Sequence, residues 1–282
     1  MGAVAKHVFL VTDAEKLEAT MRSAFELART GRPGPVVVDI PKDIQNWDGP
    51  YKGTGTLPLH GYRRRLAKVE ANNLSDDACE RFYTLLSESE RPLIYAGGGV
   101  INANATKAMR RFANEYGIPV TTTLMALGAS DTKHPLALHM LGMHGVASAN
   151  YAVEDCDFLI ATGARFDDRV AGNPGQFAPR AKNIAHFDVD FAEIGKVKRA
   201  NWHHVGMLER DLTDLLAYGR RIGFAKKFDG WHEEIASLKS EHAMNYDRDS
   251  ELIQPYAVIE EINKHTKGEA IISTGVGQHQ MW

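Results

Sequence analysis

The chain has 282 residues, of which 44% are hydrophobic and 24% are charged, enough apolar material for one large or two ordinary domains. Thirty-three Lys and Arg against 36 Asp and Glu give a net charge of −3, which provides no long-range attraction for nucleic acid or an anionic membrane. The two cysteines form no C-x-x-C pair, and no apolar stretch reaches the roughly 18 to 20 residues that span a bilayer, so we expect the cytoplasm or an organelle interior.

The first 45 residues predict one helix followed by one strand. Apolar side chains recur at helical spacing from about residue 13 to residue 30, after a capping Thr12 or Asp13, and Gly31 ends the pattern. The β-branched run VVVDI predicts a strand that is buried on both faces. Residues 46–65 are rich in Gly and Pro without apolar periodicity, and we assign residues 46–74 to an interdomain linker.

Residues 75–244 predict a regular alternation of helices and strands. We expect strands at PLIYA, IPVTTT, DFLIATG and NIAHFDVD, and helices over 75–89, 104–116, about 145–154, 208–220 and 229–243. This alternation is typical of an α/β fold with an open, doubly wound parallel sheet.

A second polar linker precedes the last predicted elements, a helix at PYAVIEEINKHT and a strand at EAIIST. The two flanking parts, 1–45 and 245–282, each supply one helix and one strand, too little to bury a core alone. We therefore expect one complete domain between two partial α/β domains, in a chain that is an internal piece of a longer protein.

Three consecutive glycines, Gly97, Gly98 and Gly99, follow the strand PLIYA. Each glycine in ordered structure costs on the order of 0.5–1 kcal/mol relative to Ala, so a run of three needs a physical reason. One interpretation is the close approach of a ligand to bare backbone, because ligands bind at the carboxyl ends of parallel strands. The alternative is a tight turn only, since the triplet does not match G-x-G-x-x-G.

Charged residues follow two further predicted strands. The segment GARFDDRV begins at Gly163 and contains Arg165, Asp167, Asp168 and Arg169. Arginine forks there suit a phosphate or a carboxylate, although a surface cluster of salt bridges fits the same residues. Asp188 and Asp190 end the strand NIAHFDVD, where an acidic side chain commonly binds a ribose hydroxyl. Together these strand ends predict a dinucleotide-binding groove.

The segment GMHG, residues 142–145, lies just before a predicted helix. Flexible Met143 and small glycines beside His144 suit a loop that lies against a flat ring, but a histidine such as His144, taken alone, is more often structural than a ligand. The sequence contains no G-x-S-x-G, no G-x-x-x-x-G-K-[ST], no H-E-x-x-H and no EF-hand loop, which disfavours hydrolase, P-loop and zincin chemistry.

Several segments, in order and spacing, resemble the catalytic large subunit of the acetolactate synthase (acetohydroxyacid synthase) family. These are GRPGPVVVDIPKDIQ, YAGGGV, LMALG, LHMLGMHG, NYAVEDCD, GARFDDRV, HFDVDFAEIGK and EAIISTGVGQHQMW. The resemblance implies the end of a pyrimidine-binding domain (1–45), the linker (46–74), a whole central FAD-binding domain (75–244), and a second linker with the start of a diphosphate-binding domain (245–282).

The resemblance also implies the reaction. Family members use thiamine diphosphate and Mg²⁺ to decarboxylate pyruvate and join the two-carbon unit to pyruvate or 2-ketobutyrate, in branched-chain amino acid biosynthesis. FAD is bound without net redox. A homodimer or tetramer of the full subunit is implied, and a regulatory small subunit is left open.

The resemblance further assigns individual residues. FAD contacts are implied at Arg32, Gly97, Gly98, Gly99, Thr123, Leu124, Gly142, Met143, His144, Gly163, Ala164, Arg165, Asp167, Arg169, Val170, Asp188, Val189, Glu193 and Ile194. Thiamine diphosphate contacts are implied at Val276, Gly277, Gln278 and His279. Arg169 would in addition bind the carboxylate of the second substrate, a role that its fixed charge fits, and Lys42 would lie in a channel near the active site.

Some family features are missing from this chain. The glutamate that activates thiamine lies upstream in the family and the Gly-Asp-Gly metal motif lies downstream, so we expect no metal ligands here and no turnover by this chain alone. Gly206-Met207-Leu208 replaces the usual Gly-Asp-Val and leaves one FAD contact open. The alternatives are another FAD-containing thiamine-diphosphate carboligase, such as glyoxylate carboligase, or a non-catalytic nucleotide-binding module.

Overall fold

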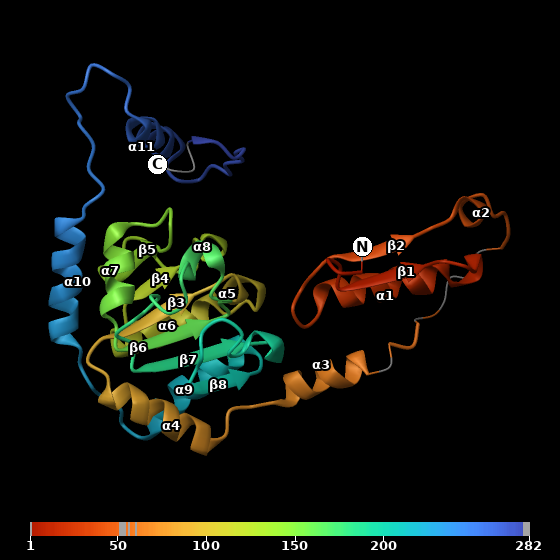
Figure 1. Cartoon of the computed structure of the whole chain (residues 1–282), viewed down its shortest axis with the longest axis horizontal. Coiled ribbons are helices and arrows are strands. Elements are labelled where there is room, and N and C mark those ends of the chain that lie inside the picture. The colour runs from red at the N-terminus through yellow and green to blue at the C-terminus, as the bar shows by residue number, and fades with distance from the viewer. Residues whose placement is uncertain (1, 51–54, 56, 60, 279–282) are drawn as a thin grey trace.

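The structure, a computed structural model, describes residues 2–50, 55, 57–59 and 61–278. It contains two parallel sheets (Figure 1). The smaller sheet pairs β1 (His7–Leu10) with β2 (Val36–Asp39). The larger sheet has the strand order β5-β4-β3-β6-β7-β8, and all five pairings are parallel. Its strands are β3 (Pro92–Ala96), β4 (Val120–Thr122), β5 (Ala137–Met140), β6 (Phe158–Thr162), β7 (Asn183–Asp188) and β8 (Trp202–Val205).

The helices connect these strands in the expected alternation. In the first part of the chain they are η1 (Ala14–Lys16), α1 (Leu17–Arg29), α2 (Lys42–Gln45) and α3 (Tyr62–Ala71). Around the large sheet they are α4 (Asp76–Glu88), α5 (Gly99–Asn102), α6 (Thr106–Tyr116), η2 (Leu124–Ala126), α7 (Ala147–Asp155), α8 (Asp168–Ala171), η3 (Phe191–Glu193), α9 (Leu208–Arg221) and α10 (Asp229–Glu241). The last helix is α11 (Pro255–Thr266).

The strand order places a topological switch point between β3 and β6. From β3 the chain adds β4 and β5 on one side, then crosses over and adds β6, β7 and β8 on the other. The expectation of an open, doubly wound parallel α/β sheet is therefore confirmed. In such sheets the crevice at the switch point, outside the carboxyl ends of the strands, is the usual place for a ligand.

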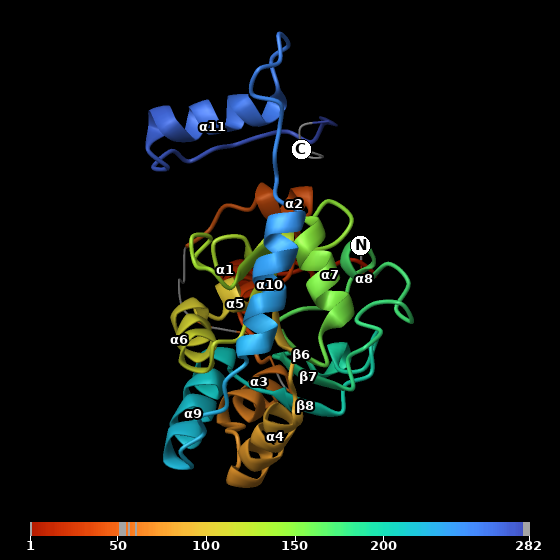
Figure 2. The same cartoon turned by 90° about the vertical axis from the view of Figure 1, so that its left-hand side faces the viewer.

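An aromatic cluster fastens α4 to the sheet. Phe82 of α4 is fully buried, and its ring centroid lies 5.6 Å from that of Phe158 and 5.3 Å from that of Trp202. Tyr83 then links α4 to its helical neighbours, because its hydroxyl donates to the carbonyl of Leu215 in α9 at 2.7 Å and contacts the Tyr116 hydroxyl of α6 at 2.9 Å. The helices α4, α6 and α9 thus pack as one layer. The helices α7 and α10 lie side by side and form a second pair, separate from that layer (Figures 1 and 2).

Several expectations about single elements are wrong. The large sheet has six strands rather than four, because the short β5 and β8 carry too little apolar pattern to be predicted. The strand β2 is only partly buried, since β1 is its one neighbour in the described part of the chain. Residues 269–274 form no strand and are exposed, with no described strand beside them. The segment assigned to the linker contains the helix α3, which the sequence pattern did not predict, while the domain bounds themselves stay a prediction.

The glycine triplet after β3 allows the loop after β6 to approach closely. A Cβ atom added to Gly97 would lie 2.2 Å from the carbonyl oxygen of Gly163, and one on Gly99 would lie 2.6 Å from the Cα of Gly163. The backbones also bond directly, since the N–H of Gly97 donates to Thr162 at 2.9 Å and that of Gly99 to Gly163 at 3.0 Å. A side chain at either position would separate β3 from β6 at the switch point.

We expect Gly97→Ala to lower the free energy of unfolding by about 2–3 kcal/mol, the size typical of an overpacked site where backbone must move. Urea denaturation of the purified chain measures this change. Gly230→Ala is the matched control, because nothing lies within 4 Å of a Cβ added at this position of α10. The control should be neutral or stabilising by about 0.5–1 kcal/mol, and equal losses in both variants would contradict the prediction.

Candidate functional site

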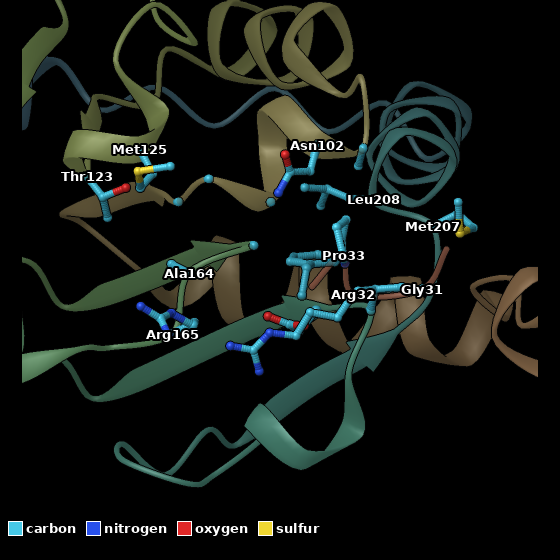
Figure 3. A pocket seen from close by; sticks show the side chains of 18 of the residues that line it. Gly31, Arg32, Pro33, Asn102, Thr123, Met125, Ala164, Arg165, Met207 and Leu208 are labelled. Carbon is cyan, nitrogen blue, oxygen red and sulfur yellow. The ribbon is translucent and has the colours of Figure 1, made fainter. Parts of the chain in front are cut away.

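A cleft of about 630 Å³ opens at the switch point of the large sheet (Figure 3). Its floor and sides come from the segments that follow five strands of that sheet. These are Gly97–Gly99 with Asn102 and Ala103 after β3, Thr123–Met125 after β4, Gly163–Arg165, Asp167, Arg169 and Val170 after β6, Asp188 and Val189 at the end of β7, and Gly206–Leu208 after β8, with Tyr95 and Phe187 below them. One cleft therefore joins the strand ends that the sequence had suggested separately.

A further wall comes from the first part of the chain. Arg29, the last residue of α1, and residues 30–33, which follow it, line the cleft together with Leu66 and Glu70 of α3. Arg32 reaches across to the central domain, where its guanidinium forms an ion pair with Glu193 and lies 3.4 Å from Asp190 Oδ2. The cleft is thus built from two parts of the chain that are distant in sequence.

The helix α3 connects these two parts. At its start, Arg63 forms a bidentate pair with Glu26 of α1, with both N–O distances 2.7 Å. Beyond its end, the Asn72 side chain donates to the carbonyl of Val205 at 2.8 Å, and Arg210 of α9 donates to the carbonyls of Glu70 at 2.5 Å and Asn72 at 3.0 Å. The helix is therefore attached at one end to α1 and at the other to the end of β8 and the first turn of α9.

The cleft is lined by four arginines, one of them Arg29, and also by the acidic side chains of Glu70, Asp167 and Asp188. Arg32, Arg165 and Arg169 all line it, and Figure 3 shows the first two among the lining side chains. Arg165 Nη2 lies 2.8 Å from Asp167 Oδ2, but 56% of the Arg165 side chain stays exposed. Planar guanidinium groups donate parallel hydrogen bonds to phosphate or carboxylate oxygens. This wall of the cleft is suited to an anion.

The carboxylate of Glu193 is held ionised by its partners. Burial alone would raise the pKa of Glu193, but hydrogen bonds from Lys196 and Arg32 outweigh it, so the pKa lies below its ordinary value. Lys196 Nζ lies 3.0 Å from Glu193 Oε1. The negative charge is therefore available to fix Arg32 at the edge of the cleft.

Asp188, at the end of β7, faces the cleft in a different environment. Its Oδ1 accepts the N–H of Asp190 at 2.9 Å, yet burial raises the pKa of Asp188 above the usual range. Beneath it, the buried His186 ring bonds through Nε2 to the carbonyl of Ala164 at 2.9 Å, and burial lowers the pKa of this imidazole. His186 is therefore a neutral donor that holds the Ala164 loop against β7.

One polar atom on the cleft lacks a partner in the protein. The hydroxyl of Thr123 is buried, and no residue of the described chain offers it a hydrogen bond. Because a buried polar group without a partner costs on the order of 1–3 kcal/mol, such an atom beside a cleft is a natural contact for a ligand.

The structure brings most of the predicted FAD residues to this cleft. Those that line it are Arg32, Gly97, Gly98, Gly99, Thr123, Leu124, Gly163, Ala164, Arg165, Asp167, Arg169, Val170, Asp188 and Val189. Gly142, Met143, His144, Glu193 and Ile194 do not line it. Met143 is largely exposed and its N–H donates to the carbonyl of Arg169 at 3.2 Å, and Glu193 is linked to the cleft through its ion pair with Arg32.

The remaining predicted residues lie elsewhere. Lys42 is exposed at the start of α2 and does not line the cleft. Val276, Gly277 and Gln278 are exposed beyond α11 and line none of the pockets found in the described chain, and His279 lies outside the described residues. Residues 2–50, 55, 57–59 and 61–278 contain no group of three or more His, Cys, Asp or Glu placed to hold a metal ion.

Sequence reasoning gave no role to residues 29–31, Pro33, Leu66 and Glu70, and it raised residues 206–208 only through the family resemblance, as a contact left open. The last of these follows β8, and a parallel strand recognised there would have indicated it.

In the described part of the chain, no helix combines the length and apolar character that crossing a bilayer requires.

Comparison with known proteins adds an independent finding. Residues 79–215 match the family described as thiamine pyrophosphate enzyme, central domain. The chain is 45% identical over 288 residues to acetolactate synthase 1, chloroplastic, of Zea mays, and 42% identical over 288 residues to the corresponding Nicotiana tabacum enzyme and to the Arabidopsis thaliana acetolactate synthase, chloroplastic. Each match covers 99% of this chain but 43%, 41% and 41% of the relatives, so the chain spans about two fifths of their length.

We expect Glu193→Gln to lower the free energy of unfolding by about 1–2 kcal/mol near pH 7, less than for a fully buried pair because Arg32 is 38% exposed. The folded-state pKa of Glu193 is lowered, so this stabilisation is fully present above its ordinary value of 4.5 and disappears as the pH falls through the lower folded value. Urea titrations at several pH values measure it. Glu154→Gln, at an exposed position of α7, is the control, and a pH-independent difference would contradict the assignment.

Proposed function

We propose that this chain, whose residues 79–215 match the family described as thiamine pyrophosphate enzyme, central domain, is part of the catalytic subunit of an acetolactate synthase. The similarity to curated acetolactate synthases over 99% of the chain carries this proposal. The proposed reaction is the decarboxylation of pyruvate and its ligation to pyruvate or 2-ketobutyrate, with thiamine diphosphate and Mg²⁺, on the route to branched-chain amino acids. The proposed substrates are small 2-keto acids.

We propose that the cleft at the switch point holds FAD. The described residues fit this cofactor, because one wall is cationic, the loops at the floor expose backbone through glycines, and the orphaned Thr123 hydroxyl faces the same space. Arg32 and Arg165 are the residues suited to its diphosphate, and Asp188 to a ribose hydroxyl. When bound, FAD would supply a flat ring and a dianionic bridge that order these loops, without net redox.

The structure supports the remaining predicted contacts, with substrate, thiamine diphosphate and the channel, to different degrees. Arg169 lines the cleft with an exposed side chain and is free to reach a substrate carboxylate, the role we propose for it. The Val276–Gln278 segment is exposed and lines none of the pockets described above, so no step of the reaction is assigned to it. Lys42 remains a proposed channel residue.

The alternatives are less favoured. The reported relatives, at 42–45% identity, are acetolactate synthases rather than glyoxylate carboligases or isolated nucleotide-binding modules. These relatives are chloroplastic, which supports an organelle stroma as one location alongside a bacterial-type cytoplasm. We propose a homodimer or tetramer for the full subunit and leave a regulatory small subunit as a question for binding experiments.

Flavin binding tests the cofactor assignment. We expect the purified chain to take up FAD, seen as quenched flavin fluorescence, and Arg165→Gln to raise the dissociation constant about tenfold through the loss of one charged contact, equivalent to about 1.4 kcal/mol. Arg180→Gln is the matched control, because Arg180 pairs with Asp155 and does not line the cleft. A chain that binds no FAD, or equal weakening by both variants, would remove the assignment.

We expect the 282-residue chain alone to form no acetolactate from pyruvate, even with FAD, thiamine diphosphate and Mg²⁺ added. The reason is the absence of the family's activating glutamate and metal motif from this sequence. A colorimetric acetolactate assay measures the rate, with a full-length relative as the positive control. A rate above background that depends on thiamine diphosphate would contradict this expectation.

A further inference from the structure

The ammonium group of Lys6 binds the end of α1 and the loop that follows it. Its Nζ donates to the carbonyl oxygens of Leu27 and Thr30 at 2.6 Å each and of Arg32 at 2.9 Å. The carbonyl of Leu27 is among the last four of α1, which have no partner within the helix. A cation at this end of a helix is also favoured by the helix dipole. Lys6 therefore joins the helix end and the loop in one set of contacts.

Tyr62 of α3 closes the same site from the other side. Its hydroxyl donates to the carbonyl of Thr30 at 2.9 Å and lies 3.1 Å from Lys6 Nζ, which is also 5.1 Å from the centre of the Tyr62 ring. The backbone N–H of Lys6 donates to the carbonyl of Pro35 at 2.7 Å. Gly31 within the loop has φ +58°, a left-handed conformation that glycine adopts readily. The loop is thus fixed in an unusual backbone path.

The loop of residues 30–33, which contains Arg32, forms one wall of the cleft. The Arg32 backbone is held by Lys6 through its carbonyl, and the Arg32 side chain is held by Glu193 on the central domain. Gly31, Arg32 and Pro33 line the cleft between these two attachments (Figure 3). The direction of the Arg32 guanidinium therefore depends on where Lys6 places its backbone.

We propose that Lys6 is a positioning residue for this wall: by holding the carbonyls of Leu27, Thr30 and Arg32, it sets the place of Arg32 and with it the affinity of the cleft for FAD. The inference rests on the proposed function as far as FAD is concerned. Lys6 itself does not line the cleft, so its effect is transmitted through the loop backbone. A methionine has nearly the same length but cannot donate a hydrogen bond, and it would leave all three carbonyls without their shared partner.

Hydrogen exchange of the full chain without FAD tests the first part of the proposal, that Lys6 holds the loop after α1 in place. The N–H of Gly34 donates to the carbonyl of Ala28 at 3.0 Å, so its exchange reports whether the loop stays closed. We expect Lys6→Met to accelerate exchange in the peptide 27–36 by at least about tenfold, while peptides of β3 and β6 stay unchanged. Lys16→Met is the control, because Lys16 is 67% exposed and pairs with Asp13 at 3.1 Å.

Flavin titration of the same variants tests the second part of the proposal, that Lys6 sets the affinity of the cleft for FAD. We expect Lys6→Met to raise the FAD dissociation constant about tenfold, Lys6→Arg to recover part of the loss, and Lys16→Met to leave it unchanged. Tyr62→Phe, which removes one donor to the Thr30 carbonyl, should act in the same direction by a smaller factor and serves if Lys6→Met does not fold.

The outcomes separate the two proposals. Unchanged exchange in peptide 27–36, or acceleration spread equally over β3 and β6, would overturn the positioning role. Faster local exchange with an unchanged FAD dissociation constant would overturn its link to the cleft. If the unmodified chain binds no FAD, the cofactor assignment fails, and the exchange data still decide whether Lys6 holds the loop.

Discussion

The backbone contact between the β3 and β6 loops is the constraint on which the site depends. Gly97 and Gly99 allow the main chain of Gly163 to approach so closely that hydrogen bonds join the two loops directly. The carboxyl ends of the two central strands thereby stay together at the point where the sheet reverses direction. The cleft lies over this junction, so the same small residues shape the fold and leave main chain accessible to a ligand.

A second requirement is that the first part of the chain meets the central domain at a defined place. Arg32 pairs with Glu193, and Lys6 and Tyr62 hold the loop that carries Arg32. These contacts join residues that are far apart in sequence, and each is electrostatic or polar rather than a packed apolar interface. The wall of the cleft that contains Arg32 therefore depends on the docking of a segment that lies outside the large sheet.

The sequence predicted the centre of the fold better than its edges. Strands β3 and β6 are fully buried on both faces, so their continuous apolar runs were recognisable. The edge strands β5 and β8 are only four residues long and contain histidines, His139 in β5 and His203 and His204 in β8, so neither showed a continuous apolar run. The strand-end arginines indicated an anion site from local chemistry alone. Arg32 entered only through a family resemblance, because no local pattern shows that it meets Glu193.

The double attachment of α3 has a consequence for how this protein tolerates change. Its first turn is bound to α1 through Arg63 and its far end to β8 and α9 through Asn72 and Arg210, so the helix acts as a rigid spacer. A lengthened α3 would therefore displace one side of the cleft relative to the other.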